Sequence, residues 1–342
     1  MKVINKVIIR LDAGNKYGLG HLSRCISIIN EIDALDYLFV IKSDNHEMVK
    51  NFLNFNFNKN YSIDFLDENC TNIFEIERLV NLYDKNNLLI IDHYSADENY
   101  QLSLFKSKIE WLQLDSHAKI NFYARWVMHG SPGATHEVYE KLKKNEKTEF
   151  LIGPEYCIIK DDILNLKKYR RPRKNLNKVI ICFGGGDDRD ATITCLESID
   201  FSLLNDIKFY VSISPYNVNF EKIKQFENKG LIEIIKRDEL HLRMSESDLA
   251  LVAPGMISYE SAFLGLPMIL VTIADNQLIN SIAWENKGCA VNIGTVKDVP
   301  NKLNLYLNVL FNNPNKLELM SSNCLKLVDG KGVSRIVKQI TK

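Results

Sequence analysis

The stretch LALVAPGMISYESAFLGLPMILVT, residues 249–272, decides the fold of this chain. It begins with an apolar run of strand length, 249–253, and closes with another, 268–272. Gly255 lies where the first run would turn into a helix, and Gly265-Leu-Pro267 would end that helix and start the second strand. The pattern therefore predicts two parallel strands joined by a helix.

The same alternation of short apolar runs and amphipathic segments extends along most of the chain. In the first half it predicts strands at 6–9, 37–41, 61–65, 88–92, 111–114, 125–128 and 150–152, with helices at 21–35, 47–53, 72–83 and 99–106. In the second half it predicts strands at 178–183, 207–213, 232–235, 249–253 and 268–272, then a mainly helical region at 297–341. The fold class expected is α/β, with two Rossmann-like domains, each built on a parallel sheet, facing a cleft that binds the ligand.

Length and local composition place the domain boundary. A chain of 342 residues exceeds the size at which one hydrophobic core usually keeps growing. Residues 165–177 are polar and basic and lack apolar rhythm, so they are expected to be a linker. The N-terminal domain is then 1–164 and the C-terminal domain 178–342, with a helical tail that could pack back across the first domain.

Composition excludes several classes of protein. Hydrophobic residues are 46% and charged residues 25%, and 43 Lys and Arg balance 43 Asp and Glu, so nothing indicates a nucleic-acid binder. No signal peptide is expected, and no run of about 18 apolar residues predicts an integral membrane segment. The seven scattered cysteines are typical of a reducing cytoplasm, where we expect the protein. The oligomeric state is not indicated.

A glycine-rich turn followed by a histidine is the first candidate for catalysis. Residues 10–25 read RLDAGNKYGLGHLSRC, so a strand leads into the turn and His21 opens the next helix. Gly14, Gly18 and Gly20 allow positive φ and a close approach of the backbone to a ligand. The positive end of the helix dipole favours a neutral imidazole, the form that a general base needs. A capping or core histidine is the alternative.

Two further glycine motifs are candidates for binding phosphate. Residues 183–190, FGGGDDRD, follow a strong strand and either cradle phosphate or form a tight turn with an N-cap. In the opening stretch, the helix after Gly255 presents its first N–H groups and the Ser258 hydroxyl, which can hold a diphosphate. Glu260 can accept both hydrogens of a ribose diol, or it only compensates the helix dipole. The next loop brings Asn276 and Gln277 to the same sheet edge.

Residues 90–95, IIDHYS, form a buried strand that ends in polar side chains. Polar groups at the carboxyl end of such a strand face the ligand, so Tyr94 is a candidate contact for a sugar or water. His93 is more often a structural histidine. Asp92 with His93 would suit a metal, but no third ligand has convincing spacing, so we expect no metal and no cofactor.

In these motifs the chain resembles the UDP-sugar hydrolases of pseudaminic-acid biosynthesis and their relatives in spore-coat polysaccharide synthesis. Its second half also looks like the nucleotide-binding half of the UDP-N-acetylglucosamine transferase of peptidoglycan assembly. The matching stretches occur in the family's order: RLDAG at 10–14, GLGHLSRC at 18–25, IDHY at 91–94, LIGPEY at 151–156, FGGGD at 183–187, GMISYESAFLGLP at 255–267, DNQ at 275–277 and DGKG at 329–332.

The resemblance implies a GT-B-like fold with UDP bound mainly by the second domain, and it gives the site residues their roles. His21 would activate water, with Tyr94 and Asn276 supporting it. The UDP-binding set would be Gly20, Gly184, Gly185, Gly255, Met256, Ser258, Glu260 and Gln277, and the sugar side would include Asp12 and Tyr17. The implied reaction removes UDP from UDP-2,4-diacetamido-2,4,6-trideoxy-β-L-altrose by breaking the bond between anomeric carbon and oxygen.

The sequence departs from the family's pattern near the expected sugar side. A pair of acidic residues is replaced by 114–118, LDSHA, an arginine by Lys160 and an asparagine by His129. Two other functions therefore stay open. The first is a glycosyltransferase that passes the sugar to an acceptor hydroxyl, for which His21 could equally act as base. The second is a nucleotide-sugar-binding protein without catalysis, which would bind UDP-sugar and never turn it over.

Overall fold

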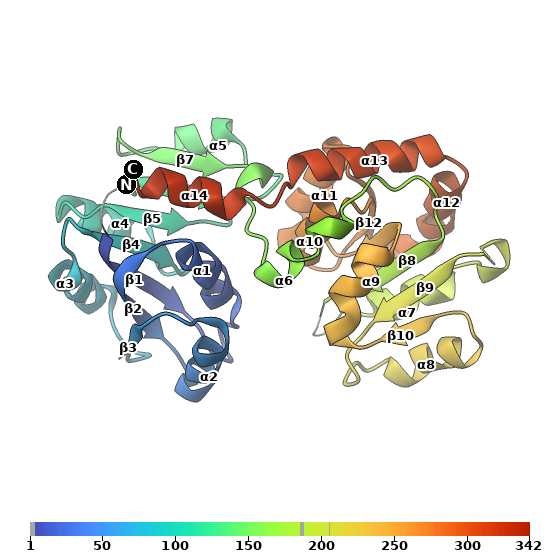
Figure 1. Cartoon of the computed structure of the whole chain (residues 1–342), viewed down its shortest axis with the longest axis horizontal. Coiled ribbons are helices and arrows are strands. Elements are labelled where there is room, and N and C mark those ends of the chain that lie inside the picture. The colour runs from blue at the N-terminus through green and yellow to red at the C-terminus, as the bar shows by residue number, and fades with distance from the viewer. Residues whose placement is uncertain (1–3, 185–187, 205) are drawn as a thin grey trace. The chain divides into compact units, whose positions relative to one another are not determined.

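The computed structural model describes residues 4–184, 188–204 and 206–342 (Figure 1). The chain divides into two compact units, the first formed by Met1–Lys160 with Lys331–Lys342 and the second by Asp161–Gly330. Each unit has its own parallel sheet, covered by helices, and its own hydrophobic core.

The first unit contains a seven-stranded sheet in the order β3-β2-β1-β4-β5-β6-β7. All its strand pairs are parallel. The strands are β1 (Ile4–Asp12), β2 (Ala34–Lys42), β3 (Tyr61–Leu66), β4 (Asn87–Asp92), β5 (Trp111–Leu114), β6 (Trp126–His129) and β7 (Glu149–Ile152). All seven strands expected from the sequence in this half are present.

The second unit contains a six-stranded parallel sheet in the order β10-β9-β8-β11-β12-β13. Its strands are β8 (Lys178–Cys182), β9 (Lys208–Ser212), β10 (Glu233–Ile235), β11 (Leu249–Val252), β12 (Met268–Thr272) and β13 (Ala290–Thr295). Strand β13 was not predicted, because Asn292 and Gly294 interrupt its apolar run.

Both sheets reverse their strand order at the same relative place. In the first unit β1 lies between β2 and β4, and in the second β8 lies between β9 and β11. The loops that leave β1 and β4, and those that leave β8 and β11, therefore diverge at the carboxyl edge. Such a switch point is where doubly wound sheets bind ligands.

Helices connect nearly all consecutive strands. In the first unit they are α1 (Gly20–Asn30), α2 (His46–Asn56), α3 (Asn72–Leu82), α4 (Glu98–Lys106), α5 (His136–Lys141) and α14 (Gly332–Ile340). In the second they are α6 (Asp161–Leu164), α7 (Ala191–Ser198), α8 (Phe220–Asn228), α9 (Leu240–Glu246), α10 (Met256–Leu264), α11 (Leu278–Asn286), α12 (Val299–Phe311) and α13 (Pro314–Leu327). The helix expected at 21–35 ends early, at Asn30, because β2 already begins at Ala34.

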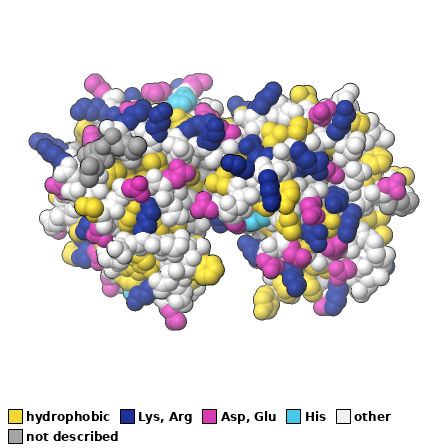
Figure 2. Space-filling model, in the orientation of Figure 1, with side chains coloured by type: hydrophobic (Ala, Val, Ile, Leu, Met, Phe, Trp, Pro, Cys, Tyr) yellow, Lys and Arg dark blue, Asp and Glu magenta, His cyan; other side chains and the backbone are white. Residues whose placement is uncertain are grey.

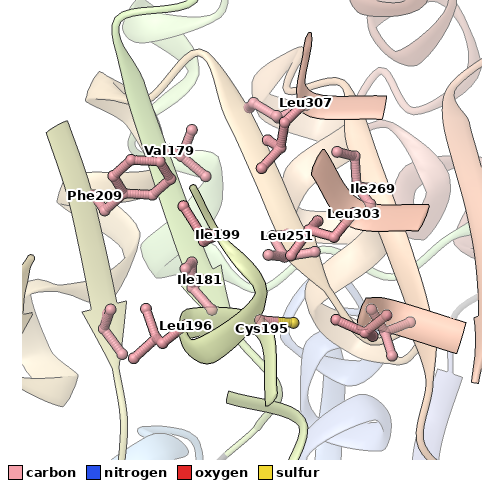
Figure 3. Close-up of a cluster of buried hydrophobic side chains, with 14 of the residues drawn as sticks. Val179, Ile181, Cys195, Leu196, Ile199, Phe209, Leu251, Ile269, Leu303 and Leu307 are labelled. Atoms are coloured by element: carbon pink, nitrogen blue, oxygen red, sulfur yellow. The ribbon is translucent and has the colours of Figure 1, made fainter. Parts of the chain in front are cut away.

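Buried strand residues alternate between the two faces of each sheet. In β1, Val7 and Ile9 pack into one core cluster and Ile8 into the cluster on the opposite face. In the second unit, Val179, Ile181 and Leu251 pack with Leu303 and Leu307 of α12 (Figure 3). Burial on both faces explains why these strands are continuous apolar runs.

The structure moves the expected domain boundaries. The C-terminal helix α14 belongs to the first unit, where Ile336 and Ile340 enter the core beside β1 residues (Figure 1). Residues 165–177 are not a free linker but part of the second unit. Arg173 is fully buried there and donates to the carbonyl of Ser245 at 2.9 Å, while Arg170 donates to the carbonyls of Phe263 and Val328. Carbonyls left open at helix ends accept these donors, which the local composition could not reveal.

Helix α14 is held to the first unit through a close backbone contact at Gly332. A Cβ there would lie 2.1 Å from the carbonyl oxygen of Cys157. We expect Gly332→Ala to lower the free energy of unfolding by about 1–3 kcal/mol, because backbone cannot yield as a side chain can. Gly20→Ala is the control, since no heavy atom lies within 4 Å of its Cβ. Equal urea midpoints for the two variants would contradict the tight contact.

Surface charge and helix hydropathy agree with the composition. Figure 2 shows Lys, Arg, Asp and Glu side chains interspersed over the visible face of each unit. No helix in the described part of the chain combines the length and apolar character needed to cross a bilayer.

Candidate active site

The glycine-rich turn after β1 is locked by its own backbone and by the loop after β2. Gly14 and Gly18 exchange backbone hydrogen bonds of 3.2 and 2.8 Å, and both have positive φ, 146° and 72°. The φ of 146° at Gly14 is a conformation that residues with a Cβ rarely adopt, and a Cβ there would also lie 2.0 Å from Asp44 Oδ1, so the position favours glycine. Gly20 needs no positive φ, because it is already the first residue of α1. Tyr17 is half-buried within the turn.

This turn delivers His21 to the end of β4. His21 Nδ1 lies 2.8 Å from Asp92 Oδ1, and both side chains are almost completely buried, with 9% and 1% exposed. His21 follows β1 and Asp92 ends β4, the two strands that meet at the switch point. The topology of the sheet therefore creates a His–Asp pair from residues 71 positions apart.

Arg24 completes this cluster from one turn further along α1. Its guanidinium binds Asp92 with two nitrogens and donates to Ser116 Oγ at 3.2 Å. Burial alone would raise the pKa of the Asp92 carboxyl, but the charge and hydrogen bonds of Arg24, followed by those of His21, outweigh it and lower that pKa. Asp92 is therefore a carboxylate that can only accept hydrogen bonds.

The ionised carboxylate determines how His21 is protonated. Since Asp92 cannot donate, Nδ1 of His21 carries the proton of their shared hydrogen bond. Arg24 Nη2, 3.2 Å from the same nitrogen, is also a donor and cannot bond to a protonated Nδ1. The lone pair of the ring then lies on Nε2, for which the described residues provide no hydrogen-bond partner. A histidine held in this tautomer has the arrangement of a general base.

A pocket of about 280 Å³ opens beside the pair, within the first unit. His21, Asp92 and Tyr94 line it together with Asp115 and His117. The Tyr94 ring meets His21 edge-on at 4.9 Å between centroids and stacks on His117 at 5.6 Å. Tyr94 is 70% exposed, so its ring is an aromatic surface next to His21 on which a sugar can pack.

Asp12, which the resemblance assigns to the sugar side, forms an ion pair with a buried arginine instead. It is buried and accepts from Arg10 Nη1 at 2.7 Å, while Arg10 Nη2 donates to Glu75 at 2.7 Å. Two acidic side chains thus pair with one fully buried guanidinium, so Asp12 is a structural partner here. His93 is also structural, because burial and then the charge of Arg10 lower its pKa well below the usual value and leave a neutral ring against Tyr100.

In the second unit, helix α10 begins at the switch point without a side-chain cap. Its N-cap is Gly255, and the N–H of Ser258 donates to the Gly255 carbonyl at 3.0 Å, so the N–H groups of Met256 and Ile257, which receive no side-chain cap, can serve a ligand. Ser258 does not supply its hydroxyl as expected. It is fully buried, donates to the carbonyl of Gly255 at 2.6 Å and accepts from Trp284 Nε1 at 2.9 Å. Both bonds shape the start of the helix, which is a positioning role rather than a contact with diphosphate.

The other predicted residues of this loop region lie at the same edge of the sheet. Met256 is 54% exposed at the start of α10. Gln277 approaches Gly255 and accepts from the Ile273 N–H at 3.1 Å, which fixes the loop after β12. Asn276 is exposed in the same loop. Glu260 is nearly buried and faces His241, with 3.4 Å between its Oε2 and the ring Nε2.

A hollow of about 460 Å³ lies at the carboxyl edge of β8, β9 and β10. Its lining includes Gly184, Ser212, Phe220 and Ile234. Burial raises the pKa of the Cys182 thiol at the end of β8, although hydrogen bonds with Gly184 and Ser212, two residues of this lining, oppose the shift. Gly184 has the positive φ, 113°, of a tight turn, whereas Gly185 falls outside the described residues.

The substituted family positions have local partners. His129 is hydrogen-bonded to Tyr139 at 2.6 Å, and burial lowers its pKa to about 4 despite the opposing charge of Asp115. Lys160 is exposed at the end of the first unit. In the ranges that the structure describes, no three His, Cys, Asp or Glu side chains gather as metal ligands would.

Sequence reasoning missed the partners of His21. The sequence pattern suggests Asp92 only as part of an incomplete metal site, and it assigns no role to Arg24. Two signals could have found them: Arg24 follows His21 at the helical spacing of three residues, and Asp92 ends the strand next to β1. His117, whose contact with a ligand the sequence leaves open, lies in the lining of the pocket.

These features define a protein with the GT-B fold, built from two Rossmann-like domains. No family model matches the chain. It is 25% identical over 285 residues to the uncharacterized protein MJ1062 of Methanocaldococcus jannaschii, covering 78% of this chain and 55% of that protein. It is 23% identical over 223 residues to the spore coat polysaccharide biosynthesis protein SpsG of Bacillus subtilis, covering 63% of each. The chain thus spans less than two thirds of the length of these curated relatives.

Solved structures share this fold over nearly the whole chain. Acinetobacter baumannii MurG has a TM-score of 0.67 at 14% identity, covering 98% of this chain and 99% of its own. Anabaena HepE in complex with UDP has a TM-score of 0.61 at 13% identity, covering 97% and 98%. A UDP-GlcNAc 2-epimerase from Neisseria meningitidis, bound to UDP-GlcNAc, has a TM-score of 0.57 at 14% identity, covering 98% and 99%. At these identities the likeness establishes the fold alone.

Proposed function

We propose that this protein hydrolyses a UDP-linked 2,4-diacetamido-2,4,6-trideoxyhexose to UDP and the free sugar. The observation that carries the proposal is the 2.8 Å contact between His21 Nδ1 and Asp92, whose two carboxylate oxygens also accept from Arg24. It leaves one basic nitrogen beside a pocket with an aromatic wall. The name of the relative SpsG, which refers to polysaccharide biosynthesis, supports a sugar substrate.

The reaction needs one proton acceptor and a stabilised leaving group. Nε2 of His21 takes a proton from water as the water oxygen bonds to the anomeric carbon, and the bond from that carbon to the UDP oxygen breaks. The proton stays on the imidazolium until solvent removes it, and Asp92 stabilises that cation through Nδ1–H. The electron pair leaves with UDP, whose diphosphate charge the uncapped start of α10 can stabilise.

We assign UDP to the second unit. The first-turn N–H groups after Gly255 would hold the diphosphate, the Gly184 turn would pass close to it, and Glu260 would accept hydrogen bonds from the ribose hydroxyls. The hollow beside Gly184 has apolar walls, including Phe220 and Ile234, that suit a nucleobase. The structural neighbour HepE was solved in complex with UDP, which supports UDP as the ligand of this fold. Tyr94 and Asn276 are assigned to the sugar.

The decisive test is phosphorus and proton NMR of the protein with the altrose-configured UDP-sugar, in EDTA and without an acceptor. Release of UDP and free sugar is expected, and the anomer formed first reports the face that water attacks. If UDP binds but the UDP-sugar survives, hydrolysis is wrong for this substrate. If neither UDP nor the UDP-sugar binds, the assignment of the second unit is wrong as well.

Glu260→Ala is expected to weaken UDP binding about ten- to a hundredfold, because hydrogen bonds from the ribose to a carboxylate are charge-assisted. Calorimetric titration with UDP measures the effect. Glu260→Gln keeps the shape and one acceptor, so its loss should be smaller. If the alanine variant bound UDP as tightly as the wild type, Glu260 would have no part in ribose recognition.

A glycosyltransferase is the second candidate, and one observation favours it. Another hollow of about 560 Å³ lies at the carboxyl edge of β2 and β3 in the first unit, with Ser43, His46 and Phe65 in its lining. It offers room for an acceptor that hydrolysis does not need. An acceptor-dependent loss of UDP-sugar, with no release of free sugar in its absence, would establish this candidate instead.

A further inference from the structure

We propose that His241 is a positioning residue for ribose recognition, which holds the Glu260 carboxylate in place by bridging it to Asp162. This inference rests on the proposed role of Glu260 and adds a residue that no family motif contains. Its consequence is a selectivity for nucleotides with a 2′,3′-diol that depends on the protonation of one imidazole.

The geometry is a histidine between two carboxylates from different helices. His241 Nδ1 lies 3.2 Å from Asp162 Oδ2 of α6, and His241 Nε2 lies 3.4 Å from Glu260 Oε2 of α10. An imidazole donates from both nitrogens only when it is protonated, so the bridge requires an imidazolium. The ring is 28% exposed and Glu260 11%, so both are shielded from much of the solvent.

The charges around the ring favour that protonated form. Burial by itself lowers the pKa of His241, as does its place in the first turn of α9, but the hydrogen bonds and charges of Asp162 and Glu260 prevail and raise its pKa to about 9. Because this exceeds the unfolded value of about 6.5, the bridge contributes its full stability below about pH 6.5. The contribution is lost as the pH rises through about 9.

The other charged side chains on the elements packed against α9 pair with residues other than His241, line the hollow beside Gly184 or lie in the turn before α9. In β8, Lys178 pairs with Glu246 at 4.0 Å. Before α9, Glu239 accepts from the N–H of Lys236 and lies 4.0 Å from Arg243. Arg237 and Asp238 share that turn with Glu239, and Arg237 lines the hollow beside Gly184. Among the residues that the structure describes, Asp162 and Glu260 are thus the charged groups paired with the imidazole.

Fixing Glu260 before the ligand arrives has a thermodynamic reason. A free glutamate loses rotamer freedom when it binds a diol, and this loss weakens binding. His241 occupies Oε2 only, and no described residue donates a hydrogen bond to Oε1. That oxygen and the second lone pair of Oε2 remain for the two ribose hydroxyls. The benefit exists only for a ligand that carries the diol.

The experiment compares UDP with 2′,3′-dideoxy-UDP by calorimetric titration from pH 6 to 10. The ratio of their affinities isolates the diol, because uracil and phosphate titrate alike in both ligands. In the wild type the ratio should be constant near neutral pH and fall as the pH passes 9. In His241→Asn it should be about five- to tenfold smaller at pH 7 and independent of pH. His136→Asn, an exposed histidine in α5, is the matched control and should behave as the wild type.

Each outcome is decisive for a different statement. If His241→Asn binds UDP and the ratio of the two affinities equals that of the wild type, whether or not both affinities are lower, His241 has no role in recognising the diol. No UDP binding to the wild type would overturn the proposed function itself. Should His241→Asn fail to fold, Asp162→Asn tests the same bridge. In this variant the affinity ratio should fall at a pH below 9, because one of the two carboxylates that favour the imidazolium is gone. A flat wild-type profile contradicts the inference without any variant.

Discussion

Replacing His21 with alanine or asparagine should reduce hydrolysis of the UDP-sugar by about 10²–10⁴-fold and leave UDP affinity nearly unchanged. The reason is that water at neutral pH is a poor nucleophile, and Nε2 of His21 is the proposed acceptor for its proton. UDP itself is assigned to the second unit, which keeps all its residues in this variant. Single-turnover kinetics gives the loss in rate, and calorimetric titration gives the UDP affinity.

His136→Asn is the matched control, because this histidine is exposed in α5, away from the pocket residues. It should turn over substrate at the wild-type rate. Retained turnover in His21→Ala would contradict the proposed base. A parallel loss of UDP affinity and rate would instead show that His21 acts mainly in binding.

Asp92→Asn should reduce turnover by up to about 10⁴-fold, although the amide has the shape of the carboxylate. Asp92 accepts the proton of His21 Nδ1 and thereby leaves the lone pair on Nε2. The asparagine amide can donate to Nδ1, which forces the proton onto Nε2 and removes the base. The variant also leaves Arg24 without its carboxylate partner, so some loss of thermal stability accompanies the loss of rate.

Asp67→Asn is the control for Asp92→Asn. It replaces an aspartate with asparagine just beyond β3, the edge strand, and should leave the rate of turnover unaffected. The pH–rate profile separates orientation from charge. If Asp92 fixes the tautomer, the asparagine variant stays slow at every pH at which it is folded. Recovery of the wild-type rate at any of these pH values would contradict the role of Asp92 in fixing the tautomer.

The sequence alone predicted most of the fold, because its signals are local. Strands β1, β2 and β4 of the first unit contain apolar runs buried on both faces, and the helices between the strands carry their own caps, such as Asn45, Thr71 and Asp97. Strand β13 was missed because polar and glycine residues hide its apolar character. His21 and Tyr94 were also predicted as site candidates, since glycine turns and polar strand ends are local features.

Only the tertiary structure decided which side chains meet. Asp92 joins His21 because β4 crosses back to lie beside β1, and Arg24 is drawn to the same carboxylate. Ser258 also differs from its expected role because of neighbours in space. Its hydroxyl donates to the Gly255 carbonyl and accepts from Trp284. Helix α14 of the helical tail, by contrast, lies in the first unit as its sequence suggested, whereas His241 meets Glu260 only in the folded chain. Hydrogen bonds and ion pairs act over a few ångströms in space, and separation along the sequence does not limit them once the chain has folded.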